Sequence, residues 1–196
     1  MNALRLIISF SPWIVFGLLA GSTIQSLTFA LLLALVLTVV TSFHDLRRMN
    51  PMSWVTLVYF TLMIVAILGF KQYFLVAYLG IFSMAVLSVF CWGSILIRKP
   101  FTLPYACEGI DPARTKRPAF IRANYVIAAV WGLAFVIDLF IDIVAFYNKS
   151  FQNSGYSNIT WAFMVIALAF TIWYPEYARK RAMEAAQAEE QKAGTP

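Results

Sequence analysis

Two aspartates, Asp138 and Asp142, lie in a stretch from 123 to 147 that is otherwise almost entirely apolar. The stretch is long enough to cross a bilayer, and a carboxylate near the membrane centre costs roughly 2.5 to 3.5 kcal/mol unless it is partnered or neutral. A spacing of four residues stacks the two side chains on one face of a helix, about 6 Å apart. Two like charges this close in a low dielectric do not ionise together easily. The pair is therefore the chain's first candidate for a functional site.

Two chemical interpretations of the pair stay open. In the first, the carboxyl groups face the interior of a helix bundle and take up a proton or bind a cation. In the second, they form hydrogen bonds with Ser, Thr, Trp or Tyr side chains of neighbouring helices, and Lys71 or Lys149 neutralises Asp142. Counting 1.5 Å per residue inward from position 147 puts Asp142 roughly 7 Å deep and Asp138 roughly 14 Å deep. Asp142 is thus within reach of a lysine at the outer rim, whereas Asp138 lies near the midplane.

Asn124 and Trp131 share this apolar stretch and are candidate supporting residues. Asn124 lies at the rim of the membrane, next to basic Arg122, where it can cap the helix or bond to a neighbour. Trp131 lies deep, where its indole N–H requires a partner, so we expect it to face protein. Gly132 beside it permits the close approach of another helix, as small residues do in membrane bundles. Packing is the favoured interpretation for these residues.

The elements that position these residues follow from the composition, which is 61% hydrophobic and only 12% charged. Soluble domains are about half apolar and a quarter charged, so an all-α, polytopic membrane bundle is expected. We predict a six-helix transmembrane domain over 1–181 and a polar, frayed tail over 182–196. A span needs about 20 apolar residues, and six segments qualify. They are 4–20, 24–43, 53–70, 73–97, 123–147 and 159–177, and consecutive segments pair as three hairpins. The first is the shortest and contains Pro12, so whether it crosses fully stays open.

Basic residues gather on one side of this arrangement. Only Lys71 and Lys149, out of 15 Lys and Arg residues, fall on the side opposite the two chain ends. Because Lys and Arg accumulate on the cytoplasmic side of membrane spans, both termini are predicted to be cytoplasmic. The same accumulation of Lys and Arg beside the membrane explains the net charge of +6, so no nucleic acid partner is predicted.

A basic and aromatic segment follows the fourth span, from 98 to 106. We expect it to lie in the membrane interface, with Arg98 and Lys99 on anionic lipid headgroups and with Phe101 and Tyr105 touching lipid.

Other chemistry has no recognisable pattern in the sequence. His44 and Asp45 are adjacent but have no second cluster of ligands, so no metal site is predicted. Arg47 or Arg48 is expected to pair with Asp45. No catalytic residue and no cofactor are predicted, because the chain has no phosphate-binding glycine loop, nucleophile elbow or zinc-hydrolase motif.

Four short sequences resemble the bacterial intracellular septation protein A family and its uncharacterised inner-membrane relatives. They are Phe10-Ser-Pro-Trp-Ile-Val-Phe, Arg98-Lys-Pro-Phe, Phe120-Ile-Arg-Ala-Asn and Tyr177-Ala-Arg-Lys-Arg. The resemblance implies a small protein of the bacterial inner membrane that is linked to cell-envelope maintenance and division, without an established reaction. The chain departs from that pattern in its longer loop, from 102 to 117, and in its two intramembrane aspartates.

The leading hypothesis is a non-enzymatic inner-membrane protein of cell-envelope biogenesis or division. It would act as a subunit or scaffold whose partners are membrane lipids and another membrane protein or a second copy of itself. The alternative is a small transporter or channel in which Asp138 and Asp142 carry a proton or cation.

Overall fold

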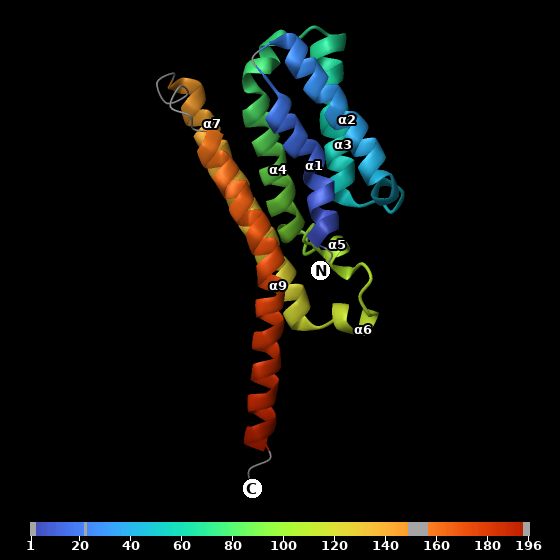
Figure 1. The fold of residues 1–196 in the computed structure, drawn as a ribbon, viewed down its shortest axis with the longest axis vertical. Coiled ribbons are helices and arrows are strands. Elements are labelled where there is room, and N and C mark those ends of the chain that lie inside the picture. Colours follow the sequence, from blue (N-terminus) through green and yellow to red (C-terminus); the bar gives the residue numbers. More distant parts are fainter. Residues whose placement is uncertain (1–2, 22, 149–156, 194–196) are drawn as a thin grey trace. The chain divides into compact units, whose positions relative to one another are not determined.

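The computed structural model describes residues 3–21, 23–148 and 157–193, and their regular structure is helical throughout, with no strand in these ranges (Figure 1). Five of the helices are long and apolar enough to cross a membrane: Ile24–Arg47, Pro51–Gly69, Tyr73–Leu96, Pro118–Tyr147 and Asn158–Glu184. The chain is therefore a multi-pass membrane protein. The first predicted span corresponds to α1 (Ala3–Leu19), which has 17 residues and contains Pro12. At 1.5 Å per residue it is roughly 26 Å long, slightly less than a hydrocarbon core of about 30 Å.

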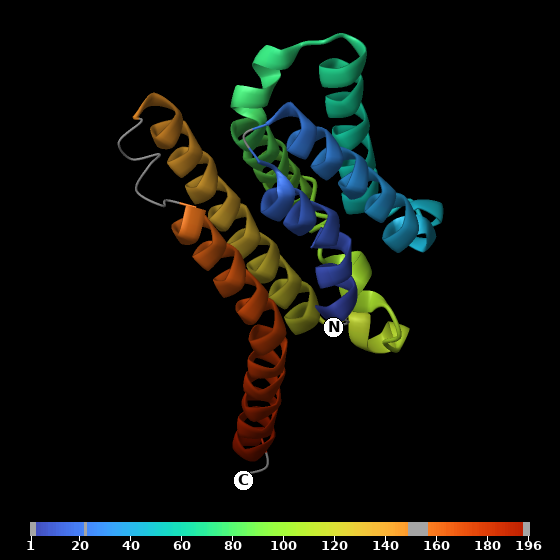
Figure 2. The same cartoon turned by 45° about the horizontal axis from the view of Figure 1, so that its top comes forward.

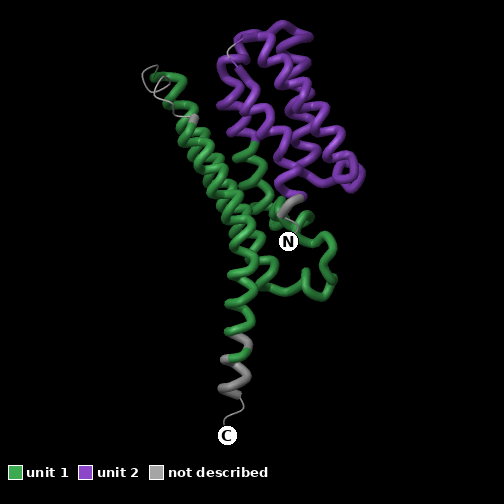
Figure 3. The backbone as a smooth tube through the Cα atoms, viewed as in Figure 1, with its two compact units in different colours: residues 1–3, 87–196 green, residues 4–86 purple. Residues whose placement is uncertain are grey.

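The chain folds as two compact units (Figure 3). Residues 4–86 form the first unit, which is unit 2 (purple) in the figure, and residues 1–3 and 87–196 form the second unit, which is unit 1 (green). The helices of the first unit are α1, α2 (Ile24–Arg47), α3 (Pro51–Ile64), the π-helical turn η1 (Val65–Gly69), the 3-10 helix η2 (Tyr73–Tyr78) and the start of α4 (Leu79–Leu96). Helix α2 begins where the Thr23 hydroxyl accepts a hydrogen bond from Ser26 N at 3.2 Å. Helix α3 begins at Pro51, which suits a first turn because its missing N–H is not needed there.

An aromatic core ties α1 to α3 in the first unit. Trp13 donates its indole N–H to the Thr56 hydroxyl at 2.9 Å, and both side chains are buried. The same indole lies 4.8 Å from the Tyr59 ring and 5.0 Å from the Phe60 ring, measured between centroids. The Tyr59 hydroxyl in turn is 2.7 Å from the Ser83 hydroxyl of α4. The Trp13 indole N–H and the Tyr59 hydroxyl thus each have a partner on another helix, which lowers the cost of burying them away from water.

The second unit is built on two long helices, α7 (Pro118–Tyr147) and α9 (Ser157–Ala193), which run side by side in opposite directions (Figures 1 and 2). The end of α4 and the short helices α5 (Leu103–Cys107) and α6 (Pro112–Thr115) precede them, and α5 and α6 contact α7. Helix α7 begins before the predicted limit of 123, because residues outside the lipid can be helical without being apolar.

The predicted polar tail continues α9. The helix passes through Pro175 and includes residues 182–193. The physical reason is the local sequence, because the Ala, Glu, Gln and Lys residues of this segment are strong helix formers.

Candidate functional site

Asp138 and Asp142 both belong to α7, one helical turn apart. The Asp138 side chain is only 2% exposed, and its Oδ1 accepts no hydrogen bond within the part of the chain that the structure describes. Asp142 is half-buried. A buried carboxyl oxygen without a donor can take up a proton or hold a cation, because either one removes the cost of an unpaired polar group in a low dielectric. Asp138 therefore has a carboxyl oxygen available for a proton or a cation, as the first interpretation of the pair requires.

The two lysines that were predicted to neutralise Asp142 do not decide between proton or cation binding and a purely structural role of the pair. Lys71 belongs to the other compact unit, where it is exposed and adopts a left-handed backbone conformation with φ of 55°. Lys149 lies outside the described residues. Neutralisation of Asp142 by either lysine stays a prediction.

Trp131 links α7 to α9. It is 1% exposed and donates its indole N–H to the Thr171 hydroxyl at 2.9 Å. Thr171 is equally buried and donates its own hydroxyl to the Ala167 carbonyl at 2.8 Å. The deep tryptophan therefore has a protein partner. No local pattern could identify Thr171 as that partner, because it lies 40 residues away.

Gly132 brings α4 close to α7. A Cβ atom at this position would lie 3.0 Å from Trp92 Nε1 and 3.1 Å from Trp92 Cε2, which is closer than a side chain normally packs. The absence of a side chain at Gly132 therefore sets how near the Trp92 indole can come to α7.

Asn124 lies at the start of the apolar part of α7 and is 2% exposed. Its amide nitrogen donates to the Phe120 carbonyl at 2.9 Å, and its backbone carbonyl accepts from the Thr102 hydroxyl at 3.0 Å. The side-chain Oδ1 has no hydrogen-bond partner among the described residues. A buried acceptor left in this way costs about 1–3 kcal/mol, so Asn124 has unused capacity to accept a hydrogen bond.

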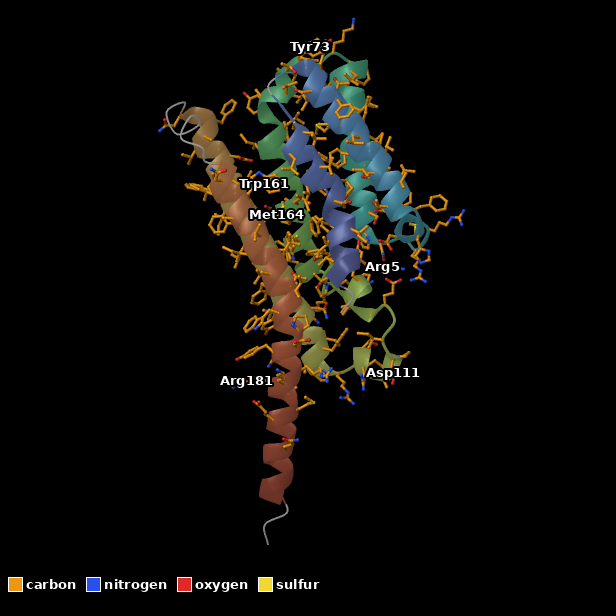
Figure 4. All side chains as sticks on the ribbon, in the orientation of Figure 1. Arg5, Tyr73, Asp111, Trp161, Met164 and Arg181 are labelled. Carbon is orange, nitrogen blue, oxygen red and sulfur yellow. The ribbon has the colours of Figure 1, made fainter. Side chains whose placement is uncertain are left out.

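A cavity of about 440 Å³ lies beside Asn124 within the second unit. Its basic side chains are Arg114 of α6, Arg117 at the start of α7 and Arg179 of α9, and its acidic one is Asp111. Figure 4 labels Asp111 just before α6, and Arg181 on the helix that supplies Arg179. Sequence reasoning missed this cavity, because the arginines were interpreted only as the positive charge of the cytoplasmic side.

The predicted lipid contact is wrong for Phe101 and Tyr105, which are each 1% exposed. After α4 the chain turns at Arg98, whose φ is 59°, and the Phe101 N–H donates to the Ser94 hydroxyl at 3.2 Å. This turn folds Phe101 back onto the Phe90 ring, with 5.5 Å between centroids. Arg98 and Lys99 are exposed, and their contact with lipid headgroups stays a prediction.

Asp45, at the end of α2, is 7% exposed and accepts a hydrogen bond from the Ser9 hydroxyl at 3.3 Å. Arg47, one of its two predicted partners, instead places its guanidinium over the Phe43 ring, 4.3 Å from the centroid. Within the described ranges no group of three or more His, Cys, Asp or Glu side chains is arranged to hold a metal ion.

Comparisons of the chain with family models, with curated proteins and with solved structures gave no match. The resemblance to the septation family therefore stays an expectation from the sequence. Among the described residues, the Asp138 carboxyl group and Asn124 beside the arginine-lined cavity each have a buried oxygen that accepts no hydrogen bond.

Proposed function

We propose that the chain is a non-enzymatic protein of the bacterial inner membrane that serves cell-envelope biogenesis or division as a subunit or scaffold. The observation that carries this proposal is the length of α9, which has 37 residues. At 1.5 Å per residue the helix is roughly 55 Å long, whereas the hydrocarbon core is about 30 Å thick. Its polar end extends beyond the lipid as a helical arm that can reach a partner outside the membrane.

The proposal includes six spans and places both termini in the cytoplasm. Thirteen basic residues on the side of the chain ends, against two on the other, support this orientation. Helix α1, with 17 residues, serves as the sixth span if the bilayer thins locally by a few ångströms, at a cost of fractions of a kcal/mol per ångström. The arm of α9 then projects into the cytoplasm.

The apolar part of α9 supports a role as a subunit. In the apolar stretch that could span the membrane, only 11% of the residues of α9 are buried, compared with 39% of those of α7. Large apolar side chains such as Val165, Ile166 and Ile172 are 57–60% exposed. This face of α9 contacts lipid or receives a helix of another membrane protein, which is the role proposed here.

Photo-cross-linking tests the proposed arm. A cross-linking amino acid replaces Gln187, which is exposed on the arm, and the matched control replaces exposed Gln72, which lies between η1 and η2. In intact bacterial cells we expect one or a few discrete cross-linked species from position 187 and none of the same mass from position 72. The scaffold proposal fails if position 187 yields no discrete species, or yields the same ones as position 72.

Proton- or cation-coupled transport is the second candidate function. It is favoured by one observation, the buried Asp138 carboxyl group whose Oδ1 accepts no hydrogen bond in the described part of the chain. Asp142, one turn further along α7, would be the next group on the path of the proton or cation.

Flux measurements separate the two candidates. The full chain is reconstituted into vesicles with an internal pH-sensitive dye, as wild type, as Asp138→Asn, and as Asp111→Asn, which removes an exposed carboxylate outside the spans. The scaffold proposal predicts no proton flux in any of the three. Flux in wild type and in Asp111→Asn that Asp138→Asn abolishes would replace it with the transport function, since Asn cannot ionise.

A further inference from the structure

We propose that the cavity lined by Arg114, Arg117 and Arg179 binds a phosphate ester that carries a hydroxyl group next to the phosphate. The volume of about 440 Å³ lies in the range of small-molecule sites. Everything that lines it belongs to one compact unit, so the cavity is a property of that unit's own fold.

The charge of the cavity favours a phosphate. Its three arginines come from α6, from the residue before α7 and from α9, so basic residues of three separate segments line one space. The acidic residue at the rim, Asp111, is engaged locally, because its carboxylate accepts the Ala113 N–H at 3.0 Å and caps α6. Guanidinium groups bind phosphate oxygens through two parallel hydrogen bonds, which a lysine cannot do.

The unpartnered oxygen of Asn124 favours a hydroxyl group on the same ligand. Asn124 lines the cavity, is 2% exposed, and uses its amide nitrogen on the Phe120 carbonyl. Its Oδ1 therefore requires a donor that the described residues do not supply. A phosphate cannot provide one when ionised, whereas an adjacent hydroxyl can.

The remaining walls are apolar and continue into the membrane-spanning helices. Phe120 and Ile127 of α7 face the cavity together with Pro175 and Met183 of α9. A ligand with an apolar portion would place it against these side chains. The shared chemistry fits two sources, the glycerophosphate headgroup of an anionic lipid and a soluble phosphate ester of a polyol.

Binding to the purified full chain in a non-ionic detergent tests the proposal with three probes. Short-chain dihexanoylphosphatidylglycerol represents the lipid source, glycerol 1-phosphate represents the soluble source, and dihexanoylphosphatidylcholine is the control without net charge. We expect saturable binding of at least one of the first two and at least about tenfold weaker binding of the third. Binding of phosphatidylglycerol alone identifies the lipid source, and comparable binding of glycerol 1-phosphate identifies the soluble source.

Variants tie the binding to the cavity. Arg117→Ala and Arg179→Ala each remove a charged hydrogen-bond donor and are expected to weaken binding at least about tenfold. Arg122→Ala is the matched control, since Arg122 is exposed on the same helix α7 and does not line the cavity. It should leave affinity within about twofold of wild type, because a charge outside the site acts only through screened solvent.

Two further variants keep the test independent of folding. Arg117→Lys retains the charge and should recover part of the affinity lost in Arg117→Ala. Asn124→Ala should weaken the binding of both anionic probes, because each carries a free hydroxyl. Helix content from circular dichroism must match wild type for each variant. The proposal is overturned if neither anionic probe binds, or if Arg122→Ala weakens binding as much as Arg117→Ala. Neither result bears on the scaffold role, which the cross-linking at position 187 tests separately.

Discussion

The hydrogen bond between Trp131 and Thr171 fastens α7 to α9, and Thr171→Val removes it with almost no change of shape. The bond measures 2.9 Å, and both side chains are 1% exposed. The substitution leaves the indole N–H buried without this acceptor. It also removes the bond from the Thr171 hydroxyl to the Ala167 carbonyl, a local bond within α9.

The magnitude follows from these two losses. Hydrogen bonds between membrane helices contribute about 0.6 kcal/mol on average and up to about 1.7 kcal/mol. A buried donor left without its acceptor costs about 1–3 kcal/mol. Since the valine methyl group recovers a little apolar contact, we expect Thr171→Val to lower the free energy of unfolding by about 1–2 kcal/mol.

The assay is reversible unfolding of the purified protein in mixed micelles with increasing dodecyl sulfate, followed by circular dichroism. Thr171→Ser retains the hydroxyl and serves as the control. A double-mutant cycle with Trp131→Phe isolates the pair, and a coupling of about 1 kcal/mol is expected. If the two single substitutions add within about 0.3 kcal/mol, the hydrogen bond does not couple α7 to α9, because contacting residues should not behave as independent sites.

Two further predictions concern other positions of the same unit. Gly132→Ala should be less stable than Gly93→Ala by about 1–3 kcal/mol in the same unfolding assay. The new Cβ at position 132 would lie 3.0 Å from Trp92, whereas nothing lies within 4 Å of a Cβ at position 93. Equal stabilities would contradict the close approach of Trp92 to α7. Burial raises the pKa of the Cys107 thiol, so less thiolate is present near neutral pH. At pH 7, maleimide labelling should therefore be slower at Cys107 than at an exposed engineered cysteine. The difference between the two labelling rates should decrease as the pH rises through the raised pKa of Cys107.

The membrane spans could be predicted from the sequence because lipid imposes a strict length and polarity on each one. The segments predicted to begin at 24 and 73 begin there in the structure, at Ile24 and Tyr73. The ends outside the lipid were harder to predict. Helix α7 starts at Pro118 and α9 continues to Ala193, since polar residues in water form helices without any hydropathy signal.

The interior contacts could not be predicted because they join residues that are distant in the chain. Phe101 and Tyr105 follow basic residues, a pattern typical of the membrane interface, yet the turn at Arg98 buries them. The Trp131 indole bonds to Thr171, 40 residues away, and the Asn124 backbone carbonyl bonds to Thr102, 22 residues away; no local pattern specifies either threonine.

The arginine-lined cavity was missed for the same reason. Arg114 and Arg117 are far from Arg179 in the sequence, and the two groups meet only when α6 and α9 are placed around α7. In the sequence alone they contribute to the positive charge of one membrane side and to nothing more specific.

The proposed position of the α9 arm in the cytoplasm depends on the orientation of the chain in the membrane. This orientation is tested most directly by labelling intact bacterial cells with a membrane-impermeant maleimide. One sample carries the natural Cys107, at the end of α5. The other carries Gln72→Cys in a Cys107→Ser background, at an exposed position between η1 and η2. If both chain ends are cytoplasmic, residue 72 is labelled in intact cells and Cys107 is labelled only after the cells are opened. Labelling of Cys107 in intact cells, with protection of residue 72, would contradict it.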